Sequence, residues 1–88
     1  MRVTMFWHGG PSYAVFDTHN PEDAEEFASL RDARNAFWRR ADFDRYYPCV
    51  DSPEAWILKG PAGSNIGAEY PDFLLTLGPR GGVRCERA

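Results

Sequence analysis

The sequence predicts an α+β fold in which one amphipathic helix packs on a small antiparallel β-sheet, with elements in the order β-β-α-β-β-β. Two observations support this prediction. A helical period of apolar residues is confined to residues 29–42, and the rest of the chain divides into short apolar runs separated by Gly and Pro. Because 88 residues provide room for one hydrophobic core, we expect a single domain over residues 1–88.

The predicted helix runs from Ser29 to about Asp42. The Ser29 side chain can cap the first turn, and Asp32 stands three residues later, as in a weak capping box. Four residues then fall on one side of the helix: Leu30, Ala33, Phe37 and Ala41. We expect this apolar stripe to be buried against the sheet.

An N-terminal hairpin is predicted ahead of the helix. Alternation over residues 2–8 places three large apolar residues on one face of a strand: Val3, Met5 and Trp7. A turn containing Gly and Pro at 9–12 then leads to a returning strand over 13–17.

The segment 25–28 has two interpretations. It is either the first turn of a helix that begins early, with Pro21 near its start, or a short extended edge that brings Phe27 to the core. We favour the extended edge, because Ser29 is a better helix cap than any residue before it.

Three strands are predicted after the helix. The first is the short run 55–59, and a Gly-rich connection at 60–68, which we expect to be mobile, leads from it to the last third of the chain. That third contains the clearest hairpin, with strands at 73–77 and 83–86 joined by a turn at 78–82. The second strand of this hairpin has a polar outer face.

The composition argues against disorder and against general affinity for nucleic acid. Aromatic residues make up 15% of the chain, and the formal net charge is −3. Nine of the ten basic residues are Arg. Two explanations stay open: Arg provides forked, planar contacts at an interface, or a GC-rich genome favours its codons.

The number of cysteines and the absence of targeting patterns indicate the cellular compartment of the protein. Two cysteines, Cys49 and Cys85, allow at most one intrachain disulfide. No charged segment followed by an apolar run resembles a signal peptide, and no stretch approaches the roughly 18 apolar residues of a membrane span. We therefore expect a soluble protein in a reducing compartment, with both thiols free and no membrane contact.

Turn and cap segments spread along nearly the whole chain carry a resemblance to a known group. They are WHGGPSYA at 7–14, FASL at 27–30 leading to Ala33, PCV at 48–50, YPD at 70–72 and GPRGGVR at 78–84. In these segments the chain resembles small accessory proteins encoded by phages of actinobacteria, of the mycobacteriophage type. The resemblance implies a viral protein made in the host cytoplasm. Its motifs are structural, so it brings no catalytic or binding residues with it.

The sequence predicts no catalytic residue, metal site or cofactor. The soft metal ligands lack the short spacings of zinc sites; they are His8, His19, Cys49 and Cys85. The Gly-rich segments 60–65 and 78–82 lack the Lys-Ser/Thr ending of a P-loop. The acidic run at 22–26 lacks the ligand pattern of a calcium loop and is expected to be a solvated face.

The candidate interaction site lies on the shoulder of the predicted helix. Trp38 follows Arg34 by four residues, about 80° from the core axis, and Arg31 flanks the same strip. An exposed patch of Arg and Trp is typical of interaction hot spots, and Arg34 can stack on Trp38. In the alternative, Trp38 packs at the core edge under Tyr46 or Tyr47, which themselves are either core closure or an exposed rim.

The functional expectation is a non-enzymatic phage accessory protein that binds and modulates a host protein. A small virion component or a homo-oligomer is a variant of this expectation. The alternative is nucleic-acid binding, with aromatics stacking on bases and five arginines on phosphates: Arg31, Arg34, Arg39, Arg40 and Arg45. Acidic residues among these arginines argue against it. An enzyme would require a polar pocket that contains Cys49 or a histidine.

Overall fold

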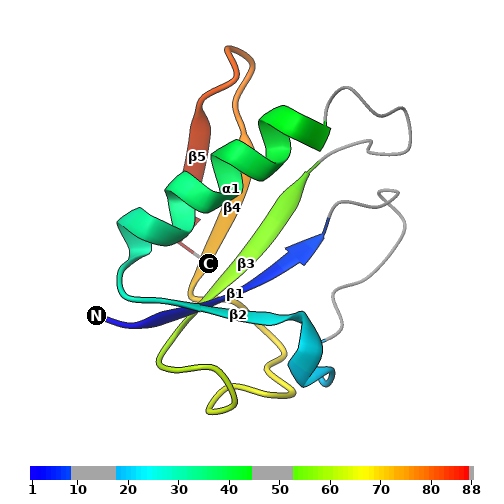
Figure 1. Cartoon of the computed structure of the whole chain (residues 1–88), viewed down its shortest axis with the longest axis vertical. Helices are drawn as coiled ribbons and strands as arrows, with labels where there is room; N and C mark the ends of the chain where they lie inside the picture. Colours follow the sequence, from blue (N-terminus) through cyan, green and yellow to red (C-terminus); the bar gives the residue numbers. More distant parts are fainter. Residues whose placement is uncertain (9–17, 45–52, 88) are drawn as a thin grey trace.

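One helix lies across one face of a five-stranded antiparallel sheet (Figure 1). The computed structural model describes residues 1–8, 18–44 and 53–87. The elements in chain order are β1 (Val3–His8), a short 3-10 helix η1 (Pro21–Asp23), β2 (Ala24–Phe27), α1 (Leu30–Asp44), β3 (Glu54–Lys59), β4 (Phe73–Leu77) and β5 (Val83–Arg87). This architecture confirms the predicted α+β fold.

The strand that precedes the helix differs from the predicted hairpin. It is β2, the segment that we favoured as a short extended edge, and it pairs antiparallel with β1. The predicted strand at 13–17 lies outside the described residues. The segment before β2 contains η1, where the Asn20 side chain accepts a hydrogen bond from the Glu22 N–H at 3.1 Å and Pro21 fixes the first position.

The sheet has the order β2-β1-β3-β4-β5, so β1 is an interior strand although it is the first element of the chain. All four neighbouring pairs are antiparallel. The β4–β5 hairpin forms as predicted, closed by hydrogen bonds from the Gly78 N–H to the Gly82 carbonyl and from the Gly81 N–H to the Gly78 carbonyl. Among the described strands, β2 and β5 are the two edges of the sheet.

Helix α1 begins where the capping signal predicts. The Ser29 hydroxyl accepts a hydrogen bond from the Asp32 N–H at 3.2 Å, which satisfies one of the free donors of the first turn. The apolar stripe is buried as expected, because Ala33, Phe37 and Ala41 are fully enclosed and Leu30 is half-buried. The helix ends at Asp44, two residues beyond the predicted end.

The hydrophobic core lies between α1 and the sheet. Five fully buried side chains of the sheet meet the helix stripe: Val3, Met5, Ala55, Ile57 and Leu75. The Trp7 ring closes this layer at one side, with its centroid 5.4 Å from that of Phe37. These buried residues occupy alternate positions of β1, β3 and β4, and they share one face of the sheet because residues paired in register lie on the same face.

The opposite face of the central strands is also buried. Thr4, Phe6 and Leu58 lie on this face and have at most 5% of their surface exposed. β1 is therefore enclosed on both faces and paired on both edges.

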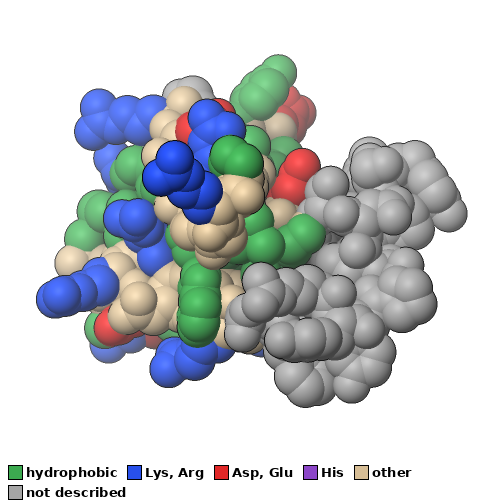
Figure 2. Space-filling view, turned by 90° about the horizontal axis from the view of Figure 1, so that it is seen from above, with side chains coloured by type: hydrophobic (Ala, Val, Ile, Leu, Met, Phe, Trp, Pro, Cys, Tyr) green, Lys and Arg blue, Asp and Glu red, His purple; other side chains and the backbone are tan. Residues whose placement is uncertain are grey.

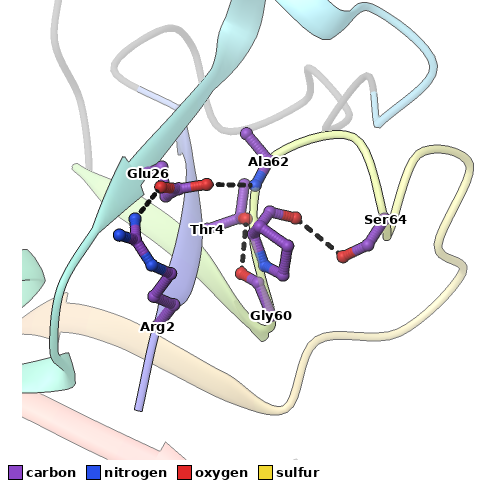
Figure 3. A network of polar contacts seen from close by, with 7 residues as sticks. Arg2, Thr4, Glu26, Gly60, Ala62 and Ser64 are labelled. Atoms are coloured by element: carbon purple, nitrogen blue, oxygen red, sulfur yellow. Dashed lines mark hydrogen bonds and ion pairs between the residues drawn. The ribbon is translucent and has the colours of Figure 1, made fainter.

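The connection after β3, which the sequence predicted to be mobile, is tied to both β1 and β2 (Figure 3). The Thr4 hydroxyl donates to the Gly60 carbonyl at 3.0 Å, and the Ala62 N–H donates to the Glu26 carboxylate at 3.0 Å. Arg2 pairs with the same carboxylate.

The far end of this connection is held by Thr18. Its hydroxyl donates to the Ala68 carbonyl at 2.9 Å, and its own carbonyl accepts from the Gly67 N–H at 2.8 Å. Gly67 has a φ of +81°, and a Cβ there would lie 3.1 Å from the His19 ring, so this close approach requires glycine.

Replacing Phe37 with Ala should lower the free energy of unfolding by about 3–5 kcal/mol, because it opens a cavity and removes the contact with Trp7. Denaturant unfolding measures the change. Arg39→Ala on the exposed side of the same helix is the control and should alter stability by no more than about 0.5 kcal/mol. Similar values for the two variants would contradict the placement of the helix.

Thr4→Val should lower the free energy of unfolding by about 1 kcal/mol, because it leaves the Gly60 carbonyl without its donor while the side-chain shape is preserved. Amide hydrogen exchange across 60–68 should accelerate. Thr76→Val is the matched control, since the Thr76 hydroxyl has no hydrogen bond within the described part of the chain. Unchanged exchange in Thr4→Val would show that this bond does not hold the connection.

Candidate protein-interaction site

Trp38 is an exposed aromatic side chain held in a fixed position. It lies on α1 with 44% of its surface accessible, and its indole N–H donates to the Gly81 carbonyl in the β4–β5 turn at 3.1 Å. One edge of the ring is thus fixed to the sheet while much of the ring remains at the surface. This exposure agrees with the exposed-patch interpretation.

Beside Trp38 lies a groove of about 360 Å³ between α1 and the start of β5. Its lining residues are Arg31, Arg34, Asn35, Trp38 and Val83, and we call this surface the α1–β5 groove. Arg31 and Asn35 are four positions apart, as are Arg34 and Trp38, so the four helix residues form one continuous strip along α1. The structure therefore brings together Arg31, Arg34 and Trp38 as the sequence predicted.

The groove is positively charged. Arg31 and Arg34 are exposed and form no ion pair with any residue that the structure describes. The β4–β5 turn lies at the top of Figure 1, and Figure 2, which looks onto this end, shows Lys and Arg side chains interspersed with hydrophobic ones. The surface therefore offers two unpaired guanidinium groups beside an exposed indole ring.

The predicted stacking of Arg34 on Trp38 is wrong. The cation–π contact is made instead by Arg40, whose guanidinium carbon lies 5.3 Å from the centroid of the Trp7 ring. Arg40 is turned toward β1 and β2, where Glu25 binds it at 2.7 Å. Trp38 turns the other way, toward Gly81, and this leaves Arg34 free to contact other groups.

Arginines elsewhere are partly engaged within the fold. Arg40 pairs with Glu25 and Arg84 lies 3.5 Å from Glu86. Two members of the acidic run at 22–26 are therefore ion-paired rather than simply solvated. Glu25 binds Arg40, and Glu26 binds Arg2. Three predicted participants lie outside the described residues: Arg45, Tyr46 and Tyr47.

The described ranges contain no assembled group of metal ligands. No group of three or more His, Cys, Asp or Glu side chains there is arranged to hold a metal ion. Cys85 is a free thiol, half-buried against the core, and Cys49 falls outside those ranges. The α1–β5 groove has neither a cysteine nor a histidine in its lining.

Sequence reasoning missed three contributors to the site. Asn35 follows Arg31 by four residues, so the helical period alone would have placed it on the same strip. Val83 and the Gly81 carbonyl come from the β4–β5 hairpin. Their position depends on how the helix lies across the sheet, and no local pattern encodes that.

No protein-family model matches the chain, and neither a curated protein nor a solved structure matches it. The resemblance to phage accessory proteins therefore stays a prediction. Within the described residues, no helix combines the length and apolar character needed to cross a bilayer.

Trp38→Phe should keep an aromatic ring at the groove but release the β4–β5 turn, because phenylalanine has no N–H to donate to Gly81. We expect a loss of about 0.5–1 kcal/mol in the free energy of unfolding, since the bond is partly exposed to solvent. Denaturant unfolding and amide exchange of Gly81 and Gly82 measure the effect. Unaltered exchange in the turn would contradict the anchoring role of the indole N–H.

Proposed function

We propose that this protein acts by binding another protein through the α1–β5 groove, and that it is not an enzyme. The proposal depends most on Trp38, whose ring is 44% exposed while its N–H is bound to Gly81. A ring that is already held in place offers a large contact area and loses little conformational freedom when a partner covers it.

The neighbouring arginines strengthen this proposal. Trp and Arg are enriched among the residues that dominate binding energy at protein interfaces. Arg31 and Arg34 have no acidic partner in the described part of the molecule, so their guanidinium groups are available for forked hydrogen bonds to a partner.

The partner that we propose is a protein of the bacterial host. This part of the proposal rests on the resemblance to accessory proteins of actinobacterial phages, which are made in the host cytoplasm. Binding there would modulate the activity of the host protein. The nucleic-acid alternative has weaker support, because Arg40 is paired with Glu25 and the net charge of the chain is −3.

Affinity capture from an actinobacterial host lysate, followed by proteomics, tests the proposal. The wild-type protein should retain a partner, and Trp38→Ala should retain at least tenfold less, which corresponds to about 1.4 kcal/mol or more of lost binding energy. Tyr70→Ala is the matched control, because Tyr70 is an aromatic residue with 78% of its surface exposed outside the groove.

Circular dichroism should show that Trp38→Ala and Tyr70→Ala are both folded. Equal capture by all three proteins would overturn the assignment of the α1–β5 groove, and the absence of any partner would overturn the proposed function. Capture that disappears after nuclease treatment would favour the nucleic-acid alternative.

A further inference from the structure

We propose that the α1–β5 groove receives an extended acidic segment of the partner protein, which adds as a strand to the free edge of β5. This inference rests on the proposed function and specifies the chemical character of the partner. It follows from the hydrogen-bond pattern of the β4–β5 hairpin, from the side of the sheet on which the groove lies, and from the charge of the groove.

Of the strands that the structure describes, β5 is the outermost on the side of the groove. In an antiparallel pair, residues that exchange hydrogen bonds alternate with residues that do not. Because the Gly78 N–H donates to the Gly82 carbonyl, Arg84 and Glu86 are the β5 residues whose backbone groups face β4. The backbone N–H and C=O groups of the alternate residues point away from the sheet: Val83, Cys85 and Arg87.

The same alternate residues lie on the face of the sheet that α1 covers. Val83, Cys85 and Arg87 are opposite Leu77, Leu75 and Phe73, whose side chains contribute to the core beneath the helix. A strand added to this edge would therefore project every second side chain toward α1, at intervals of about 7 Å. Those side chains would enter the groove, where Arg31 and Arg34 lie.

The charge of the groove selects acidic side chains. Arg31 and Arg34 have no counter-ion within the described residues, so carboxylates entering the groove would find two unpaired guanidinium groups. Trp38 and Val83 form the apolar part of the lining. The favoured segment consequently combines carboxylates with at least one apolar side chain that packs against Trp38.

A second copy of the chain fits this edge poorly. Pairing of β5 with β5 about a two-fold axis would place Val83, Cys85 and Arg87 of the second copy on the side of α1, so that strand would bring an arginine and no carboxylate to the groove. The acidic strand at the other edge, β2, has its carboxylates occupied, because Glu25 binds Arg40 and Glu26 binds Arg2. The occupant is therefore a different protein.

A peptide also fits the edge better than a nucleic acid does. The free edge of β5 presents both N–H donors and C=O acceptors, in the alternation that another strand satisfies. Phosphate oxygens accept hydrogen bonds but cannot donate to the free carbonyls.

A nuclear magnetic resonance titration tests the inference on the full chain, with a short peptide that carries two glutamates and one valine at alternate positions and threonine between them, so that the three side chains share one strand face. We expect the largest amide shifts at Val83, Cys85 and Arg87, together with a shift of the Trp38 indole N–H. The double variant Arg31→Glu/Arg34→Glu should lose at least tenfold in affinity. Arg39→Glu is the control for charge alone, because Arg39 is exposed on the same helix outside the groove lining, and it should change affinity less than twofold.

Three comparison ligands separate edge pairing from simple charge attraction. The same peptide N-methylated at every residue keeps its carboxylates but cannot form a strand ladder, and it should not bind. The same peptide with lysine in place of each glutamate should not bind either. Binding of an oligothymidylate in preference to the acidic peptide would overturn the inference in favour of a nucleic acid.

Failure of the inference can be distinguished from failure of the proposed function. If the acidic peptide leaves the β5 amides unchanged, or if the N-methylated peptide binds equally well, the strand-addition inference is wrong. Capture of a partner that depends on Trp38 would in that case still support the proposed function. If neither experiment shows binding, both proposals are wrong.

Discussion

The enclosure of β1 on both faces and both edges is the constraint on which the rest of the structure depends. On one face Val3 and Met5 meet the helix stripe, and on the other Thr4 holds the Gly60 carbonyl. On its edges the strand has β2 and β3 as partners. A strand in this position fixes the register of its neighbours, because a slip by one residue would exchange the two sets of buried side chains. The helix, the long connection after β3 and the acidic edge strand are all positioned relative to it.

The binding surface is a consequence of how one helix covers five strands. α1 packs its stripe over the central strands, and its Trp38 side extends to the β4–β5 turn, where the indole N–H meets Gly81. The opposite side of the helix is fixed by Arg40, which lies over Trp7 and pairs with Glu25. These two polar attachments lie on opposite flanks of the helix, so both sides of α1 are tied to the sheet or its turns.

Much of this fold was predictable from local pattern, and the errors have a common cause. The apolar stripe of α1, the Ser29 cap and the β4–β5 hairpin depend on residues close in sequence, and each formed as predicted. The partner of β1 and the orientation of Arg40 depend on residues far apart in sequence, and local pattern gave no reliable guide to either. The strip of Arg31, Arg34 and Trp38 was predictable for the same reason as the helix, because its spacing is helical. The contribution of Val83 required the tertiary structure.

The pairing of β1 with β3 also bears on how the chain acquires its fold during synthesis. β1 is translated before its neighbour β3, which is complete only when Lys59 has been added to the chain. Closing so long a loop has an entropic cost that must be met before the strand pairs are formed, and proteins dominated by distant contacts fold slowly. Until β3 has been translated, Val3, Met5 and Phe6 therefore lack one of the partner strands that enclose them. The strand has only six residues, and this limits the apolar surface that chaperones or other nascent chains can engage.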